Sequence, residues 1–191
     1  MKKQYWAVLA VAGAMGVAQA QEAAPKAAPA APAIAPAAAP AAAGTVVFGF
    51  EDDAWKAGKF SAENGTISVA EENATEGKKA LVLEFDRTGK AEADRPTIRI
   101  NKVVGFTGAK KVLFDYTFVG DVSAKTKIRA QIKDTAKASG NATETLTTGK
   151  STMEIDITTC DNTKLNDMKI CLDNCKTGKG KVFFDNFRAE K

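Results

Sequence analysis

The sequence contains no histidine among its 191 residues, and it has only three cysteines, two tryptophans and two tyrosines. The absence of histidine excludes Ser–His–Asp and Cys–His catalysis, histidine-ligated zinc and a histidine-based pH switch. The net charge is only +4, whereas a nucleic-acid-binding domain is expected to carry a clustered basic face. These absences argue against nucleic acid as a partner and favour a non-catalytic binding domain.

Proline is also scarce outside one segment, because five of the six prolines lie between residues 23 and 43. The same segment holds fourteen alanines. Alanine favours helix, but a proline every three or four residues removes backbone donors and clashes with the preceding turn. We therefore predict that residues 21–43 form an Ala/Pro-rich disordered linker, extended and semi-rigid with polyproline II character.

Residues 1–20 have the three parts of a secretory signal peptide. Lys2 and Lys3 supply positive charge, residues 6–17 are mostly apolar, and Ala18-Gln19-Ala20 matches a cleavage site. The apolar stretch is short for a membrane span, and no run of about 18 apolar residues follows it. We expect an exported bacterial protein, secreted or periplasmic, with no membrane span in the mature chain. An uncleaved N-terminal anchor is the alternative.

Residues 44–191 remain as one folded domain, in which apolar residues alternate with polar ones over short segments. A period of two is typical of strands with one buried and one wet face. One short helical turn is expected at 162–169. Strands are predicted at 45–50, 66–69, 81–85, 97–100, 112–118, 127–133, 152–157, 168–172 and 181–188. Short strands separated by polar turns predict an all-β fold, an antiparallel two-sheet β-sandwich or jelly roll.

Four short strings stand at the first, an early, a central and the last of these strands. They are Phe48-Gly49-Phe50-Glu51-Asp52, Gly77-Lys78-Lys79-Ala80-Leu81-Val82-Leu83, Lys111-Val112-Leu113-Phe114-Asp115 and Val182-Phe183-Phe184-Asp185-Asn186-Phe187. In this order the strings resemble the jelly-roll carbohydrate-binding modules of the galactose-binding-like superfamily. The resemblance covers residues 46–190. It bears on the fold more than on sugar binding, because function resides in sites grafted onto folds.

The resemblance implies a structural calcium between the first strand, a loop and the last strand. By motif position its ligands are Glu51 and Asp185, with Asp52 or Asp53 as a weaker third and backbone oxygens of residues 73–78 completing the shell. Carboxylate and carbonyl oxygens are the ligands that calcium takes. The alternative is that these acids cap strands or pair with Lys78, Lys79 or Arg188.

The resemblance also implies a ligand site on the concave sheet, where outward side chains are presented. We place Asp115, Arg129 and Gln131 at its centre, on adjacent predicted strands. Trp55 is a candidate platform for stacking on a sugar ring; its alternative role is to cover the end of the sandwich. Such a site is rich in charge and poor in rings, which suits a charged glycan, a short chain end or no glycan. The alternative is a plain solvated strand face.

Cys160, Cys171 and Cys175 all lie in the last third of the chain. An exported chain favours disulfides, but three cysteines allow at most one pair within the chain. We predict one structural disulfide that includes Cys175, with either Cys160 or Cys171 as its partner.

The favoured function is therefore an exported, non-catalytic module that binds carbohydrate or a cell-envelope polymer. Glu154 and Asp156, two residues apart on one strand face, are close enough for glycoside hydrolysis. However, any polar strand face presents such a pair, so we predict no enzymatic activity. The alternative function is a structural or adhesion protein of the cell envelope that binds a protein partner.

Overall fold

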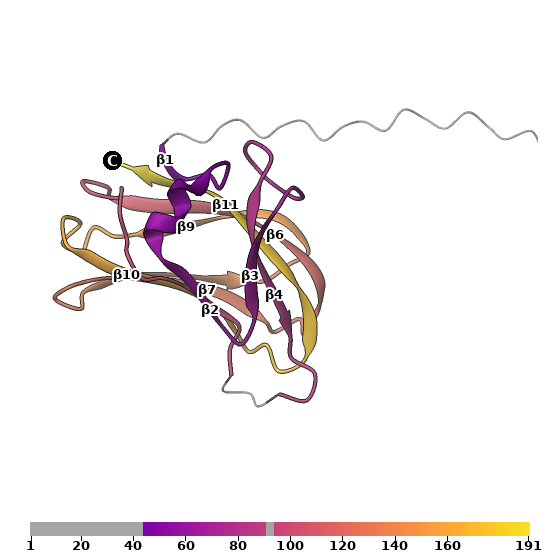
Figure 1. Ribbon diagram of the computed structural model, residues 1–191. Helices are drawn as coiled ribbons and strands as arrows, with labels where there is room; N and C mark the ends of the chain where they lie inside the picture. The colour runs from indigo at the N-terminus through magenta and orange to yellow at the C-terminus, as the bar shows by residue number, and fades with distance from the viewer. Residues whose placement is uncertain (1–43, 91–93) are drawn as a thin grey trace, which may run out of the picture. The chain divides into compact units, whose positions relative to one another are not determined.

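The computed structural model describes residues 44–90 and 94–191, so the expected signal peptide and linker lie outside the described residues. The described chain folds into two antiparallel sheets (Figure 1). In this part of the chain no helix is long and apolar enough to cross a membrane. The predicted antiparallel two-sheet β-sandwich is confirmed.

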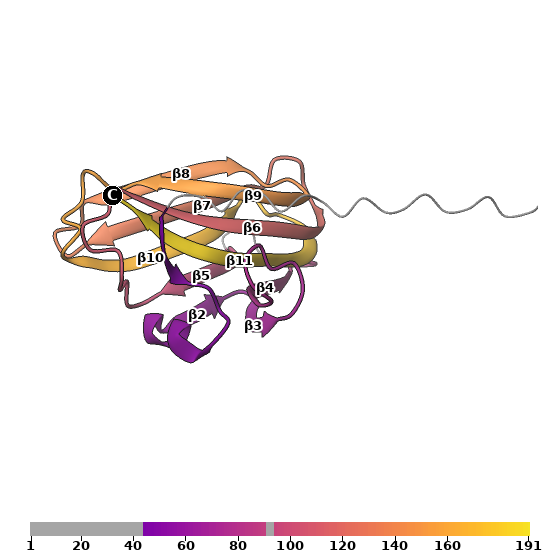
Figure 2. The same ribbon diagram turned by 90° about the horizontal axis from the view of Figure 1, so that it is seen from above.

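The first sheet has six strands in the order β3-β4-β11-β6-β9, with β1 paired to β11. In that last pair Thr45 lies opposite Ala189. Figure 2 shows β6, β9 and β11 side by side along the sandwich. The strands are β1 (Thr45–Phe48), β3 (Thr66–Ala70), β4 (Ala80–Asp86), β6 (Lys111–Val122), β9 (Gly149–Asp156) and β11 (Gly178–Glu190).

The second sheet has five strands in the order β2-β5-β10-β7-β8. A short 3-10 helix, η1 (Asp53–Gly58), precedes β2. The strands are β2 (Phe60–Glu63), β5 (Thr97–Ile100), β7 (Lys127–Asp134), β8 (Ser139–Thr145) and β10 (Leu165–Asp173).

The core lies between the two sheets, and β6 shows how alternation fills it. Val112, Phe114, Tyr116 and Phe118 are each at most 2% exposed. Asp115 lies among them in sequence but faces away from the core, because successive side chains of a strand point to opposite faces. The strand with one buried face that the sequence predicts at 112–118 is confirmed.

A β-bulge in β11 changes which side chains reach this core. The register with β6 shifts between Asp185 and Arg188, and Asn186 has a left-handed φ of 51°. Strict alternation after the inward-facing Phe184 would place Phe187 on the outside. Asp185, which directly follows Phe184, faces outward before the bulge, and the extra residue then returns Phe187 to the core and turns Arg188 to the outer face.

Phe187 is the centre of an aromatic cluster. Its ring stacks on Phe114 with centroids 5.1 Å apart. The rings of Phe48, Phe50 and Phe60 meet it edge-on at 5.9–6.4 Å. Rings contributed by both sheets and by the segment after β1 therefore converge on one fully buried side chain.

The helical turn expected at 162–169 is wrong, because β10 begins at Leu165. Two strands, β2 and β8, were not predicted from the sequence. Strand β2 has only four residues. In β8 the positions opposite the core residues of β7 are Gly140, Ala142 and Glu144. These small or polar side chains produce no apolar alternation, so the sequence contains no strand signal there.

The predicted disulfide is also wrong, because all three cysteines are free and buried. Cys171 faces outward, with its sulfur 3.4 Å from Arg129 Nη2, whereas Cys175 belongs to the core. Asp161, the residue after Cys160, donates its N–H to Asp134. Asp134 lies opposite Leu165, so Cys160 is close to the start of β10. Cys175 follows the other end of that strand, and side chains so separated cannot be bridged.

Replacing Phe187 with alanine should lower the free energy of unfolding by about 3–5 kcal/mol, because the vacated core cannot collapse fully. Urea unfolding of the full chain measures the change. Val46→Ala, at a residue 43% exposed, is the control and should stay within about 0.5 kcal/mol. Equal effects of the two substitutions would contradict the role assigned to the bulge.

Candidate functional site

The outer side of the five-stranded sheet presents a polar surface, which we call the β7–β10 face. Its members alternate with core residues on three adjacent strands, so they point away from the core. Arg129 and Gln131, both predicted site residues, lie on β7, next to the central strand β10. The face comprises Arg99 of β5, Lys127, Arg129, Gln131 and Lys133 of β7, and Asp167, Lys169, Cys171 and Asp173 of β10.

Asp173 organises the middle of this face. Its Oδ2 lies 2.7 Å from Arg129 Nε, and its Oδ1 lies 2.9 Å from Arg95 Nη1. Gln131 donates from Nε2 to Asn141 Oδ1 at 2.7 Å. Two guanidinium groups and two amides are thus held in fixed orientations, and such planar groups form directional hydrogen bonds to carboxylates and hydroxyls.

The charge of the surface is unbalanced. Arg99 pairs with Glu63 at 2.6 Å on the neighbouring strand β2, and Asp173 serves two arginines. Among the described residues no ion pair involves Lys127, Lys133 or Lys169. Basic side chains therefore exceed acidic ones on this surface. Sequence reasoning singled out neither Arg95 nor Arg99, although the alternation of residues 97–100 could have placed Arg99 outward.

Asp115 does not belong to this face, so the predicted cluster of Asp115, Arg129 and Gln131 is wrong. Asp115 lies on β6 of the other sheet, and the outer sides of the two sheets face away from each other. Alternation identified it correctly as an outward residue, but alternation does not say to which sheet a strand belongs.

Asp115 is instead the centre of a polar network. Its Oδ1 accepts from Thr152 Oγ1 at 2.7 Å and from Arg188 Nη2 at 3.1 Å. Its Oδ2 accepts from Asn186 Nδ2 at 3.0 Å and from Thr75 Oγ1 at 3.2 Å. Burial acts to raise the pKa of Asp115, but the hydrogen bonds, above all from Arg188, hold it below its ordinary value. Both oxygens are occupied by protein donors.

Asp185 anchors residues 71–79, which connect β3 to β4 and which we call the 71–79 loop. Only 1% exposed, Asp185 accepts from the backbone N–H groups of Thr75 and Glu76, each at 2.8 Å. Glu51 accepts from the N–H groups of Lys78 and Lys79 at 2.7 and 2.8 Å. The loop thereby covers a small apolar patch on the outer side of β4 and β11, formed by Ala80, Val82 and Phe183 with Ala74.

The two acids respond differently to these contacts. The N–H groups of Lys79 and Lys78 hold the pKa of Glu51 below its ordinary value. Burial raises the pKa of Asp185 despite the hydrogen bonds from the loop. Gly77 is required between them, because its φ of +65° is left-handed and a Cβ there would overlap the Glu51 carboxylate.

This arrangement does not fit the expected calcium. The loop turns N–H groups rather than carbonyl oxygens toward Glu51 and Asp185, and a cation requires converging oxygens. Asp52 is engaged elsewhere, since its Oδ1 accepts from the N–H of Ala54 at the start of η1. Within residues 44–90 and 94–191, no three His, Cys, Asp or Glu side chains are grouped to hold a metal ion.

Trp55 lies on η1 and packs against the core. Its ring meets Phe60 edge-on at 5.6 Å and lies tilted against Phe50 at 6.0 Å. It also lines an open depression of about 550 Å³ together with Glu51 and Lys79. Trp55 therefore covers the end of the sandwich, which is the alternative role that the sequence suggested, and it lies apart from Arg129 and Gln131.

No family model and no curated protein matches this sequence, but solved structures do. A family 28 carbohydrate-binding module specific for non-crystalline cellulose is 20% identical, with a TM-score of 0.56 over 78% of this chain and 96% of that one. The family 11 module of a cellulosomal cellulase from Clostridium thermocellum is 12% identical, with a TM-score of 0.51 over 78% and 95%. An exo-β-agarase is 14% identical, with a TM-score of 0.57 over 75% of this chain and 24% of the enzyme.

At these identities the likeness is one of fold. Four separated strings in the sequence implied this fold, and the solved structures agree with them across most of the described chain. The chain has the β-sandwich jelly-roll fold of carbohydrate-binding modules.

Proposed function

We propose that this protein is a non-catalytic carbohydrate-binding module and that it binds its ligand on the β7–β10 face. The observation that carries the proposal is the row of oriented guanidinium and amide groups on that face. It occurs on the fold that the family 28 and family 11 modules share. A fold does not by itself specify a function, so the side chains of the face carry the proposal.

The charge of the face favours an acidic glycan or an acidic cell-envelope polymer. Lys127, Lys133 and Lys169 lie on the same face as the Arg129–Asp173 pair and are not neutralised by ion pairs within the described residues. No aromatic side chain occupies the outward positions of β5, β7 and β10. Charge and hydrogen bonding therefore supply the affinity that ring stacking supplies in aromatic-rich sites.

The absence of enzymatic activity remains part of the proposal. Glu154 and Asp156 lie on the outward side of the edge strand β9. Glu154 pairs with Lys111 at 2.8 Å, and Asp156 accepts from the N–H and hydroxyl of Thr158. Two exposed acids committed to neighbours on an open surface do not form the cleft that glycoside hydrolysis requires.

Arg129→Ala should weaken binding to carboxymethylcellulose about tenfold, because a charge-assisted hydrogen bond contributes roughly 1.5–3 kcal/mol. Affinity electrophoresis of the full chain measures the retardation. The neutral polymer hydroxyethylcellulose, with the same glucan backbone, serves as the comparison. Lys150→Ala removes the same charge from the exposed outer side of β9 and should change the retardation less than twofold by net charge alone.

Equal losses in both variants would show that only net charge matters and would overturn the site. No retardation of the folded protein by either polymer would favour the alternative, an envelope protein that binds a protein partner. Export to the periplasm or the medium stays a prediction from residues 1–20.

Calcium binding by Glu51, Asp52 and Asp185 stays a prediction from the resemblance, and the loop contacts favour a tether that needs no metal. We expect the same Tm in calcium chloride and in EDTA. Asp185→Asn should destabilise the protein by about 1–3 kcal/mol, because a buried N–H group then faces an amide NH₂. Asp121→Asn, at an exposed residue, is the matched control. A calcium-dependent rise in Tm that disappears in Asp185→Asn would restore the metal.

A further inference from the structure

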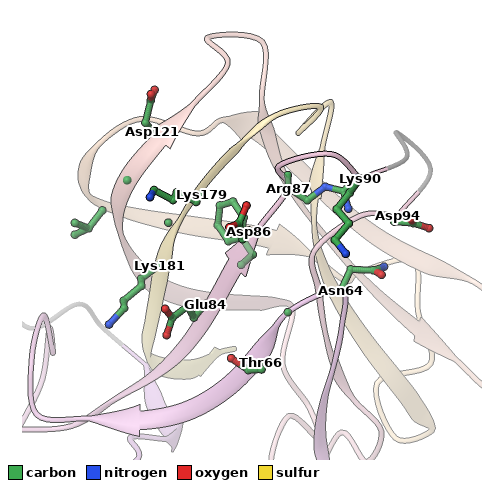
Figure 3. A pocket seen from close by; sticks show the side chains of 15 residues that line it. Asn64, Thr66, Glu84, Asp86, Arg87, Lys90, Asp94, Asp121, Lys179 and Lys181 are labelled. Atoms are coloured by element: carbon green, nitrogen blue, oxygen red, sulfur yellow. The ribbon is translucent and has the colours of Figure 1, made fainter.

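A second hollow lies on the outer side of the six-stranded sheet, where β3, β4, β6 and β11 run together. Its volume of about 1010 Å³ is at the upper end of the range of ligand sites. Figure 3 shows its charged side chains gathered over these strands. Lys181 lies beside Glu84 on one side of Asp86, and Lys90 lies on the other side. We call this hollow the β4–β11 groove.

Acids and lysines alternate across the strands of the groove. Lys181 of β11 lies opposite Glu84 of β4, and Lys179 lies between Asp86 of β4 and Asp121 of β6. Paired positions of neighbouring strands bring such side chains within reach of one another.

Most of these charges are nevertheless not engaged with each other. In the part of the chain that the structure describes, no ion pair involves Glu84, Asp121 or Lys179. Lys181 reaches only Glu72 of the 71–79 loop, at 4.0 Å. Asp86 accepts from the N–H of Thr88 with one oxygen. Carboxylate acceptors and ammonium donors therefore alternate along the groove with hydrogen-bonding capacity to spare.

The charges that the described residues bring to the groove are balanced, unlike those of the β7–β10 face. Among these residues four acids and four bases line it, namely Glu84, Asp86, Asp94 and Asp121 with Arg87, Lys90, Lys179 and Lys181. A ligand with a net charge gains little attraction from such a lining. A hydroxyl group both donates and accepts, so a polyhydroxylated neutral chain can use both kinds of group at once.

The position of the groove argues against a peptide as its ligand. It lies across the face of the sheet, where the backbone groups of β4, β11 and β6 are already paired. A peptide that adds a strand requires a free sheet edge. Recognition must therefore use side chains, and Val119, 48% exposed, supplies an apolar contact for the face of a sugar ring.

We infer that the β4–β11 groove is a second carbohydrate site, one that takes a neutral polyhydroxylated chain. The choice of ligand class rests on the proposed carbohydrate-binding function, but the site shares no residue with the β7–β10 face. Because the two surfaces lie on the outer sides of different sheets, one module holds a neutral and an acidic chain at the same time.

Amide chemical shifts of the isotope-labelled full chain test the inference. The probes are cellohexaose, mannohexaose and a β-1,3-1,4-linked glucan tetrasaccharide, with hexagalacturonate as the acidic comparison. The neutral probes should shift the amides of 84–86, 119–121 and 179–181. In the double variant Glu84→Gln/Lys181→Met the affinity obtained from these shifts should fall at least tenfold. In Arg129→Ala it should be unchanged. Raising sodium chloride from about 50 to 500 mM should not weaken it, because a neutral chain carries no charge whose attraction to the protein could be screened.

The outcomes separate this inference from the proposed function. Neutral probes that shift only β7 and β10 amides would overturn the groove and leave carbohydrate binding in place. No shift with any neutral probe would overturn the groove, while electrophoresis with carboxymethylcellulose decides the β7–β10 face independently. Groove shifts that are equally strong with hexagalacturonate would overturn the ligand class. Groove shifts that persist in the double variant would overturn the lining residues.

Discussion

The bulge at Asp185 and Asn186 is the constraint on which much of this molecule depends. One inserted residue puts Phe187 into the aromatic core, although Asp185, two residues earlier, lies on the outer face of the same strand. Without the inserted residue, Asp185 and Phe187 would lie on the same face of the strand, so one of the two side chains would lose its partners. The same step brings Arg188 to Asp115 at 3.1 Å, so the core, the loop anchor and the polar network all follow from it.

The loop anchor in turn shapes the outer side of the six-stranded sheet. The three hydrogen bonds that Asp185 accepts from Thr75 and Glu76 keep the 71–79 loop over Ala80, Val82 and Phe183. Apolar surface that would otherwise meet water is covered by a segment held through its own backbone. Glu72 of that loop lies 4.0 Å from Lys181, so the loop contacts one of the lysines that line the β4–β11 groove. Burying a carboxylate is costly, and its donors offset part of that cost.

The fold could be read from the sequence because alternation is a local signal, and β6 repeats it over many residues. The site could not be read as fully. A period of two separates inside from outside but does not assign strands to sheets, so Asp115 and Arg129 were placed together although they lie on different sheets. The N–H donors that meet Glu51 and Asp185 come from the backbone, which no residue type reveals. Strand β8 was invisible because glycine, alanine and glutamate occupy its inward positions.

The pairing of β1 with β11 sets Thr45 directly opposite Ala189. The domain therefore starts and finishes at one corner. Domains whose ends meet in this way tolerate insertion into a surface loop of another protein and permutation of their termini. This sandwich could be grafted as a cassette between two neighbouring residues of a host, and both of its broad surfaces would remain open to solvent.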